Sequence, residues 1–340
     1  MFIAIAGTPS SGKRTLLEYL VNRYGFTQVG LDKKGEVGPT DSDSSAHLEV
    51  PLSSLSVSTS STPAVTTIAT LPNPPLLPST ATLLDYTTRN WLSHHVTLDL
   101  TSYETIEPFV KRPFFLLVFL DGPLRARYER ERHRRKDITL DEFCAEHDVL
   151  LNAPEADFRR VVKAATLSIC NNAPTIAEFY KHLDQMDLLN EERLRPGWDN
   201  YFMTLASLAS HRSNCMKRRV GALLVRSKRI LSTGYNGTPR GTRNCNQGGC
   251  RRCNGSARGG EALDECLCLH AEENALLEAG RERIGEDSVL YCNTCPCLRC
   301  SVKIVQTGVR EVVYNQSYSM DAASAMVLRE GGVTLRQLLI

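Results

Sequence analysis

One histidine and two cysteines carry the spacing of a metal site, although they lie in separate segments. His270 is followed after one residue by Glu272, and Pro296-Cys297-x-x-Cys300 begins 24 residues after Glu272. Two thiolates and one imidazole supply three protein ligands, which leaves the fourth position of a tetrahedral zinc ion open to water. The chain must therefore fold so that these two segments meet at one point.

The residues around the two cysteines fit the start of a helix. Cys297 and Cys300 are three positions apart, so one helical turn presents both to the same ion. The positive end of the helix favours the thiolate form, and Pro296 suits the first helical position because it has no N–H to leave unpaired. We expect Glu272 to stand beside the ion, not on it, and to act as general acid and base.

Two alternatives remain for a cysteine pair of this kind, a closed structural zinc site and a redox-active C-x-x-C. The nearby His270 favours an open zinc site over both, because it is the only histidine after His211 and supplies a third ligand.

Most of the cysteines lie in the same half of the chain. Ten of the twelve come after residue 210, in close C-x-x-C and C-x-C spacings, and the N-terminus has the pattern of a β-strand and not of a secretion signal. Such spacings indicate metal ligands in a reducing compartment, so we expect the cytoplasm or the nucleus. The formal net charge of +2 argues against a dedicated nucleic-acid binder.

The pattern of strands and helices predicts two α/β domains. Residues 1–190 begin with a strand, a glycine loop and a helix over Lys13–Tyr24, and they include an apolar run over 114–120 of the buried-strand type. Residues 195–340 have the order αββαβαβαβ, which implies a mixed sheet with helices on both faces. Asp199 is expected to cap the first helix of this second domain.

Residues 38–82 are expected to be a disordered insertion in the first domain. Of the 30 residues from Pro51 to Thr80, 19 are Ser, Thr or Pro. Such a composition cannot bury enough apolar surface to form a core.

The glycine loop has the context of a phosphate-binding loop, between an apolar strand and a helix. Backbone N–H groups of such a loop surround phosphates, and the candidate contacts are Gly7, Gly12, Lys13 and Thr15. The G-x-P-x-x-G-K-x-T pattern resembles nucleoside monophosphate kinases of the adenylate kinase type, although Arg14 replaces the usual Ser or Thr. A basic segment over Arg125–Lys136 resembles the lid of that family, and a solvated charged helix face is the alternative.

The second domain resembles the deoxycytidylate (dCMP) deaminase branch of the cytidine deaminase superfamily. The zinc motifs match the H-x-E and P-C-x-x-C signature of zinc deaminases. Four further segments carry the resemblance: Trp198-Asp199-x-Tyr201-Phe202-Met203, Arg212-Ser213-x-Cys215, Val220-Gly221-Ala222 and Gly234-Tyr235-Asn236-Gly237-Thr238-Pro239.

This resemblance implies a three-layer α/β/α fold, a catalytic zinc and hydrolysis of dCMP to dUMP for dTTP synthesis. It also implies a homo-oligomer, commonly a hexamer, with dCTP as activator and dTTP as inhibitor. Asn236 and Thr238 are the implied nucleotide contacts. An extension like residues 1–190 is typical of fungal members.

The same resemblance implies a second, structural zinc. Cys215 and Cys245 occupy matching positions, with Cys250 and Cys266 as expected partners. The remaining cysteines of this region, Cys253 and Cys268, are alternative ligands, because six cysteines exceed the four positions of one ion. Free thiols in a loop are the other interpretation.

Two other functions remain open from the residues. One is a nucleic-acid base deaminase similar to tRNA adenosine deaminases, and the other is a nucleoside monophosphate kinase whose zinc unit is only structural.

Overall fold

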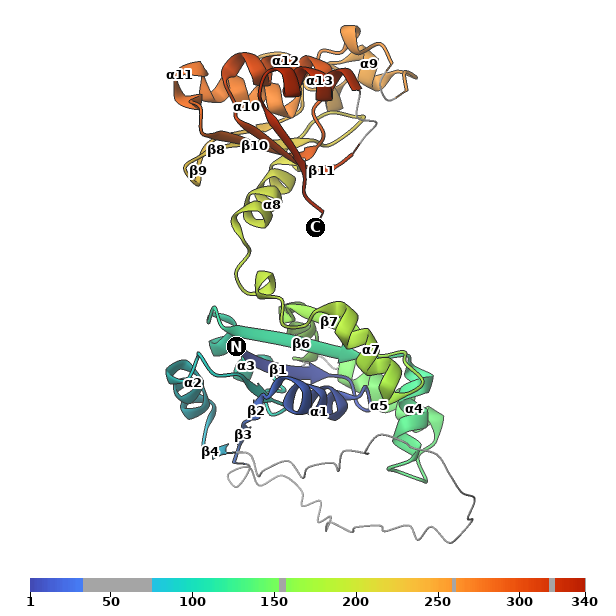
Figure 1. Cartoon of the computed structure of the whole chain (residues 1–340). Coiled ribbons are helices and arrows are strands. Elements are labelled where there is room, and N and C mark those ends of the chain that lie inside the picture. The colour runs from blue at the N-terminus through green and yellow to red at the C-terminus, as the bar shows by residue number, and fades with distance from the viewer. Residues whose placement is uncertain (33–74, 153–156, 259–260, 318–321, 340) are drawn as a thin grey trace, which may run out of the picture. The chain divides into compact units, whose positions relative to one another are not determined.

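The computed structural model describes residues 1–32, 75–152, 157–258, 261–317 and 322–339. The chain divides into two compact units, Met1–Leu194 and Arg195–Ile340, which we describe separately (Figure 1). Within the described ranges, no helix combines the length and apolar character needed to cross a membrane.

The first unit is built on five parallel strands in the order β2-β5-β1-β6-β7. These strands are β1 (Phe2–Gly7), β2 (Thr27–Gln28), β5 (His95–Thr97), β6 (Phe115–Asp121) and β7 (Leu167–Cys170), and a separate parallel pair joins β3 (Gly30–Leu31) to β4 (Leu76–Leu77). Its helices are α1 (Lys13–Tyr24), α2 (Thr80–Arg89), α3 (Tyr103–Val110), α4 (Leu124–Arg132), α5 (Leu140–Asn152), α6 (Phe158–Ala164) and α7 (Ile176–Met186), followed by a 3-10 turn over Glu191–Arg193.

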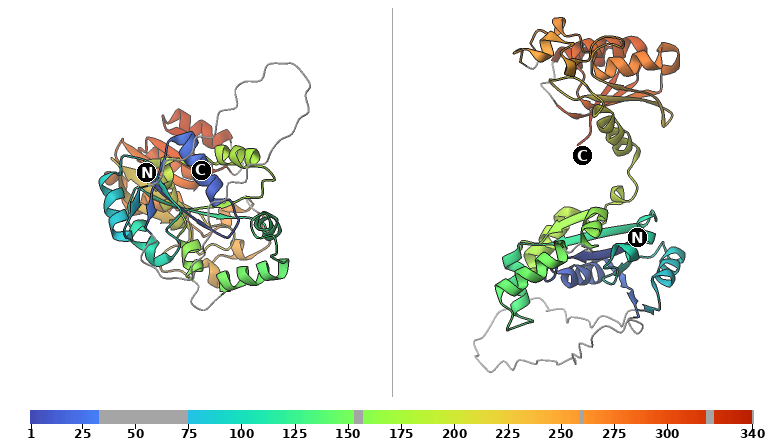
Figure 2. Two further views of the ribbon diagram at one scale, coloured as in Figure 1. Left: turned by 90° about the horizontal axis from the view of Figure 1, so that it is seen from below. Right: turned by 180° about the vertical axis from the view of Figure 1, so that it is seen from behind.

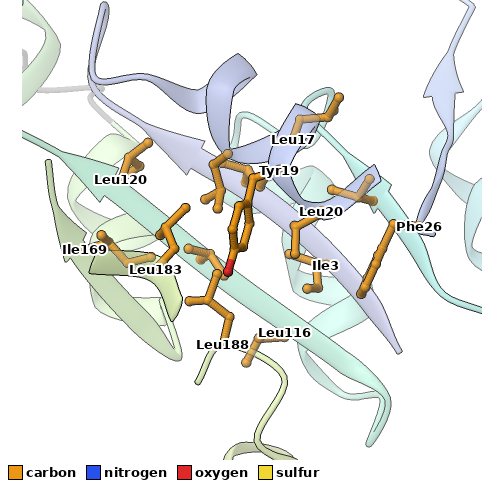
Figure 3. Packing of buried hydrophobic residues seen from close by; sticks show 14 of the residues in the cluster. Ile3, Leu17, Tyr19, Leu20, Phe26, Leu116, Leu120, Ile169, Leu183 and Leu188 are labelled. Carbon is orange, nitrogen blue, oxygen red and sulfur yellow. The ribbon is translucent and has the colours of Figure 1, made fainter. Parts of the chain in front are cut away.

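Alternating residues of β1 bury both faces of this sheet. Ile3 and Ile5 pack with α1 and α7, as Figure 3 shows for Ile3 among the side chains of α1, β6 and β7. Phe2 and Ala4 point the other way and pack with α2, α3 and α6. Each face of a parallel sheet is thus covered by helices, which is why its strands are apolar throughout.

The second unit contains a mixed five-stranded sheet in the order β12-β11-β10-β8-β9. The strands are β8 (Gly221–Arg226), β9 (Arg229–Tyr235), β10 (Ser288–Thr294), β11 (Glu311–Gln316) and β12 (Thr334–Gln337). β8 pairs antiparallel with β9 and β10, whereas β10, β11 and β12 run parallel. Its helices are α8 (Trp198–Ser210), α9 (Arg251–Asn254), α10 (Ala271–Ala279), α11 (Arg281–Ile284), α12 (Leu298–Thr307) and α13 (Ala322–Glu330), with 3-10 turns over Cys245–Gln247 and Leu263–Glu265.

The helices of this unit cover opposite faces of the sheet. Ala222 and Leu224 of β8 pack in one core with α10, α12 and α13, and these helices lie along one side of the sheet in Figure 1. Leu223 and Val225 point the opposite way and pack against α8, which also appears apart from those helices in the reverse view of Figure 2. The expected three-layer α/β/α arrangement with a mixed sheet is confirmed.

Two local expectations are corrected. The expected insertion over 38–82 is too long, because Leu76–Leu77 form a strand and α2 begins at Thr80, where Ser79 caps it; residues 38–74 lie outside the described residues. Asp199 does not cap α8, whose N-cap is Gly197. The Asp199 carboxylate instead accepts hydrogen bonds from Tyr291 (2.7 Å) and Arg336 (2.7 Å), because tertiary partners compete successfully with the local cap.

Helix α10 approaches β9 closely only because Gly234 has no side chain. A Cβ built on Gly234 would lie 2.0 Å from the carbonyl oxygen of Ala271 and 2.5 Å from the backbone nitrogen of Ala275. The start of α10 is therefore placed by this contact.

We expect Gly234→Ala to push α10 away from the sheet and to lower the free energy of unfolding by about 1–3 kcal/mol, as overpacking of a core does. Urea unfolding of the full chain measures the change. The matched control is Thr233→Ala on the exposed side of the same strand. Equal stability of the two variants would contradict the close-approach argument.

Candidate metal and phosphate sites

Two helix N-termini on one face of the second unit bring the predicted zinc ligands together. His270 is the N-cap of α10, and Cys297 is the N-cap of α12, with Cys300 in its first turn. The Sγ atoms of Cys297 and Cys300 each lie 3.3 Å from Nδ1 of His270. The two segments therefore meet at one point, and Nδ1 is the ring nitrogen that faces the cysteines.

The donor set fits zinc. Zinc–sulfur bonds of about 2.3 Å and zinc–nitrogen bonds of about 2.0 Å place nitrogen and sulfur about 3.5 Å apart in a tetrahedron. The three ligand atoms all lie within 4.8 Å of one another, and no fourth protein ligand joins their set among the described residues. One imidazole and two thiolates with an open position are typical of a catalytic zinc site.

The pKa values of the two thiols of this site are shifted in opposite directions. Hydrogen bonding to Cys300, and then to His270, lowers the pKa of Cys297 to about 3 although burial opposes this. Hydrogen bonding to the Cys297 thiolate and burial both raise the pKa of Cys300. The two cysteines thus keep one proton between them, on Cys300, and a bound metal cation would displace it.

Glu272 is buried next to these ligands. Its side chain belongs to the first turn of α10 and the residue is only 3% exposed. Burial raises the pKa of the Glu272 carboxyl to about 7, against the opposing effect of the His270 imidazole. A carboxyl with a pKa near neutrality can both accept and donate a proton at physiological pH.

A cavity of about 480 Å³ opens over this centre. Four cationic residues line this cavity together with Glu272 and two of the three ligand residues. These are Lys217, Arg218, Arg252 and Arg299. The sequence interpretation missed them, although the run Lys217-Arg218-Arg219, which begins two residues after Cys215, was a visible signal for the first two.

The two predicted nucleotide contacts have different surroundings. Asn236 lines the cavity, but its Oδ1 accepts from Ser213 (2.7 Å) and the Val220 N–H (2.8 Å), and its Nδ2 donates to the Arg218 carbonyl (2.9 Å). These bonds use both acceptor positions and one of the two donor hydrogens of the amide. Thr238 is not among the residues that line the cavity, and its hydroxyl is buried with no hydrogen-bond partner among the described residues.

The remaining cysteines of the region, Cys215, Cys245, Cys250, Cys253, Cys266 and Cys268, gather in one group, which we call the six-cysteine cluster. The four predicted ligands are all in it but do not form one set. Cys215 and Cys245 form a set with Cys253 and Cys268, whereas Cys250 and Cys266 form another set with the same two residues. Spacing alone could not show that the two presumed alternatives lie at the centre.

The predicted phosphate loop joins β1 to α1 in the first unit. Gly12 precedes the helix with φ 102°, a left-handed conformation that favours glycine. At Gly7, a Cβ would lie 2.0 Å from the Leu120 carbonyl oxygen, so the strand–loop junction also requires glycine. Lys13 Nζ donates to the carbonyls of Gly7 (3.0 Å) and Thr8 (2.8 Å), while Thr15 is half-buried in the first turn of α1.

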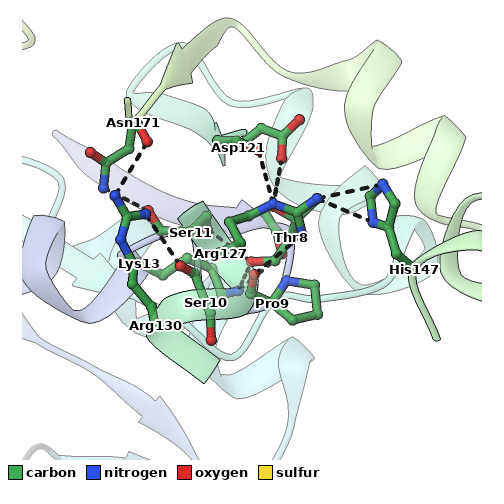
Figure 4. Close-up of polar contacts among 12 residues, drawn as sticks. Thr8, Pro9, Ser10, Ser11, Lys13, Asp121, Arg127, Arg130, His147 and Asn171 are labelled. Atoms are coloured by element: carbon green, nitrogen blue, oxygen red, sulfur yellow. Dashed lines mark hydrogen bonds and ion pairs between the residues drawn. The ribbon is translucent and has the colours of Figure 1, made fainter. Parts of the chain in front are cut away.

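Basic side chains of α4 surround this loop, as Figure 4 shows. Arg127 donates to the Pro9 carbonyl (3.4 Å), and Arg130 donates to the Ser10 carbonyl (3.4 Å). Burial, followed by the charges of Arg127 and Arg134, lowers the pKa of Lys13 to about 8. The expected basic segment over 125–136 is helical only as far as Arg132.

Known proteins are similar to this chain over both units. The family model for the cytidine and deoxycytidylate deaminase zinc-binding region matches residues 196–316. The deoxycytidylate deaminase of Schizosaccharomyces pombe is 42% identical over 98% of this chain and 96% of its own length. That of Saccharomyces cerevisiae is 46% identical over 75% of this chain and 84% of its own length.

A solved structure is also similar. The dCMP deaminase of the cyanophage S-TIM5, crystallised in complex with dCMP and dUMP, is 35% identical and covers 41% of this chain and 94% of its own, with a TM-score of 0.34.

We expect Cys300→Ser to bind about one zinc ion fewer per chain than the unsubstituted protein, because one of three ligands is lost. Elemental analysis after dialysis measures the zinc content. Cys295→Ala is the matched control, since this thiol lines the same cavity but lies outside the ligand set. An unchanged zinc content in Cys300→Ser would rule out its role as a ligand.

Proposed function

The chain belongs to the deoxycytidylate deaminases, zinc enzymes that hydrolyse dCMP to dUMP and ammonia, and we propose that Glu272 moves the protons of this reaction. His270, Cys297 and Cys300 would hold the zinc ion beside it. The observation that carries this assignment is the buried Glu272 carboxyl, whose pKa is raised to about 7 next to the three ligand atoms. The dUMP formed would supply dTTP synthesis.

The reaction adds one water molecule and releases one ammonia, so protons must move from the water to the base. Zinc, when bound, acts as a Lewis acid and lowers the pKa of a coordinated water towards about 7. Glu272 would accept one proton from the water and donate it to N3 of the cytosine ring. It would then accept the second proton from the hydroxyl group added to C4 and donate it to the amino group, which leaves as ammonia. Its burial keeps bulk water away, and its raised pKa suits both transfers.

The cavity wall offers recognition of the nucleotide. The substrate phosphate carries negative charge, and Lys217, Arg218 and Arg299 would attract it from the same wall as the catalytic centre. Asn236 would contact the nucleotide with its remaining amide hydrogen and hold the segment that carries Arg218, whose carbonyl it binds. Thr238, whose buried hydroxyl has no hydrogen-bond partner among the described residues, would be the second nucleotide contact.

We expect Glu272→Gln to lower the rate of dUMP formation from dCMP by about 10²–10⁴-fold, the usual contribution of a general acid–base residue. Zinc content should stay unchanged, because no ligand is removed. Both are measured on the same preparation by product assay and elemental analysis.

Glu273→Gln is the matched control for this experiment. Glu273 is the next residue on α10 and pairs with Lys303 outside the ligand set. Its activity should stay close to that of the unsubstituted enzyme. A near-normal rate in Glu272→Gln would contradict the proposed mechanism.

We also propose that residues 1–190 are a P-loop domain similar to nucleoside monophosphate kinases and that the Gly7–Thr15 loop binds a nucleotide phosphate. Three features support this: the strand–loop–helix context, the loop glycines, and the positive charge of Lys13, Arg127 and Arg130 around the loop. Lys13 now donates to two loop carbonyls, and an entering phosphate would offer it a stronger, charged acceptor.

Isothermal titration of the full chain with ATP tests this loop. We expect binding in the unsubstituted protein and a loss of about tenfold or more in affinity for Lys13→Ala, because a hydrogen bond to a charged group contributes about 1.5–3 kcal/mol. Arg14→Ala, whose side chain is 84% exposed, is the control and should bind normally. Absence of heat in the unsubstituted protein, or equal affinity in Lys13→Ala, would contradict phosphate binding.

The family resemblance further supports a homo-oligomer, hexameric in many members, activated by dCTP and inhibited by dTTP. A reducing compartment, the cytoplasm or the nucleus, would keep the ligand cysteines in the thiol form.

A further inference from the structure

The six-cysteine cluster contains more thiols than one tetrahedral zinc ion can bind. In each of its two four-cysteine sets, all ligand atoms lie within 4.8 Å of one another. The sets share Cys253 and Cys268, as two tetrahedral sites with a common edge would. One ion in either set would leave two of the six thiols without a metal.

We propose that the six-cysteine cluster binds two zinc ions, with Cys253 and Cys268 bridging them. Cys215 and Cys245 would complete the ligands of the first ion, and Cys250 and Cys266 those of the second. The proposal rests on this sulfur arrangement and not on the deaminase reaction, which uses a different set of ligands.

The sulfur–sulfur distances agree with this arrangement. A tetrahedral zinc ion with bonds of about 2.3 Å separates its sulfur atoms by about 3.8 Å. The shared edge, from Cys253 to Cys268, measures 3.9 Å. Cys253 is also 3.7 Å from Cys215 and 3.6 Å from Cys266, so it is placed at this spacing from a member of each set.

The local sequence places one bridging and one terminal ligand in each close pair. In Cys250-x-x-Cys253, the first residue caps the four-residue helix α9 and the second lies within it. In Cys266-x-Cys268, the first ends the 3-10 turn Leu263–Glu265. The segment from Cys245 to Cys268 therefore turns around the cluster without any strand of its own in its described part.

This segment has almost no other core. The group that holds the six cysteines contains no aliphatic or aromatic side chain among the described residues. Metal–thiolate bonds can contribute folding free energy that hydrocarbon packing does not supply here. Two zinc ions would hold together the four stretches of chain that carry the six cysteines, between Cys215 and Cys268.

A centre of two zinc ions and six thiolates would be negatively charged, and a buried arginine lies close enough to balance part of this charge. Two Zn²⁺ ions replace six thiol protons, which leaves a net charge of −2 on the cluster. Arg252 is 8% exposed, and its guanidinium lies 4.0 Å from the Cys253 sulfur. Further hydrogen bonds come to the Cys245 sulfur from the Met216 N–H (3.5 Å) and the Asn254 amide (3.8 Å).

The cluster would also position the catalytic centre. Cys268 is two residues before His270, and Leu269 between them pairs with Gly237 in an isolated bridge. Cys215, Cys253, Cys266 and Cys268 line the same cavity as Glu272. The shared ligand Cys268 would therefore anchor the chain directly ahead of α10.

Zinc content tests the number of ions. The full chain should hold about three zinc ions, of which Cys300→Ser removes one and leaves the two of the cluster. Cys245→Ser and Cys250→Ser, each in a different set, should each lower the zinc content, whereas Cys144→Ser in the first unit should not. A total of two zinc ions, or an unchanged zinc content in either cluster variant, would overturn the proposal.

Cadmium-113 NMR of the cadmium-loaded full chain tests the bridges without any substitution. We expect two tetrathiolate resonances with scalar coupling between them, transmitted through the shared sulfurs, in addition to the resonance of the His270 site. A single tetrathiolate resonance, or two without coupling, would overturn the bridging assignment. Iron with acid-labile sulfide, or disulfides among the six cysteines, would overturn the zinc assignment.

Discussion

The second unit of this protein depends on three proposed ligand atoms that must meet at one cation. Two of them lie at helix N-termini, His270 before α10 and Cys297 before α12, so each helix directs its positive end at the thiolates. The sheet sets the separation of the two helices, since both pack in one core with β8 and β10. Gly234 then allows α10 to approach β9 closely enough to bring Glu272 beside the ligands.

Burial gives the same residues their chemistry. A carboxylate out of water loses hydration, so its neutral form is favoured and its pKa rises. For Glu272 this effect outweighs the attraction of the neighbouring imidazole and brings the pKa to about 7. The cations on the cavity wall, among them Arg218, would attract the phosphate of the nucleotide to the same cavity. In the proposed mechanism, one cavity thus combines a proton carrier with a site for an anionic substrate.

The parts that could be predicted from the sequence were those fixed by local spacing. The His270 and Cys297 segments, the mixed sheet and the helix over Lys13–Tyr24 follow from ligand chemistry and hydrophobic periodicity. The parts that could not be predicted depend on tertiary partners. Asp199 binds Tyr291 and Arg336 instead of capping α8. Cys253 and Cys268 belong to both cysteine sets only because four separate stretches of chain converge.

The most direct test of the catalytic assignment is a crystal structure of the zinc-loaded enzyme with anomalous diffraction measured at the zinc absorption edge. We expect an anomalous peak at the position of a zinc ion that is bound by Nδ1 of His270 and the sulfurs of Cys297 and Cys300. The fourth ligand should be a solvent oxygen within hydrogen-bond distance of the Glu272 carboxylate. A fourth ligand supplied by the protein, whether Glu272 itself or another side chain, would contradict it.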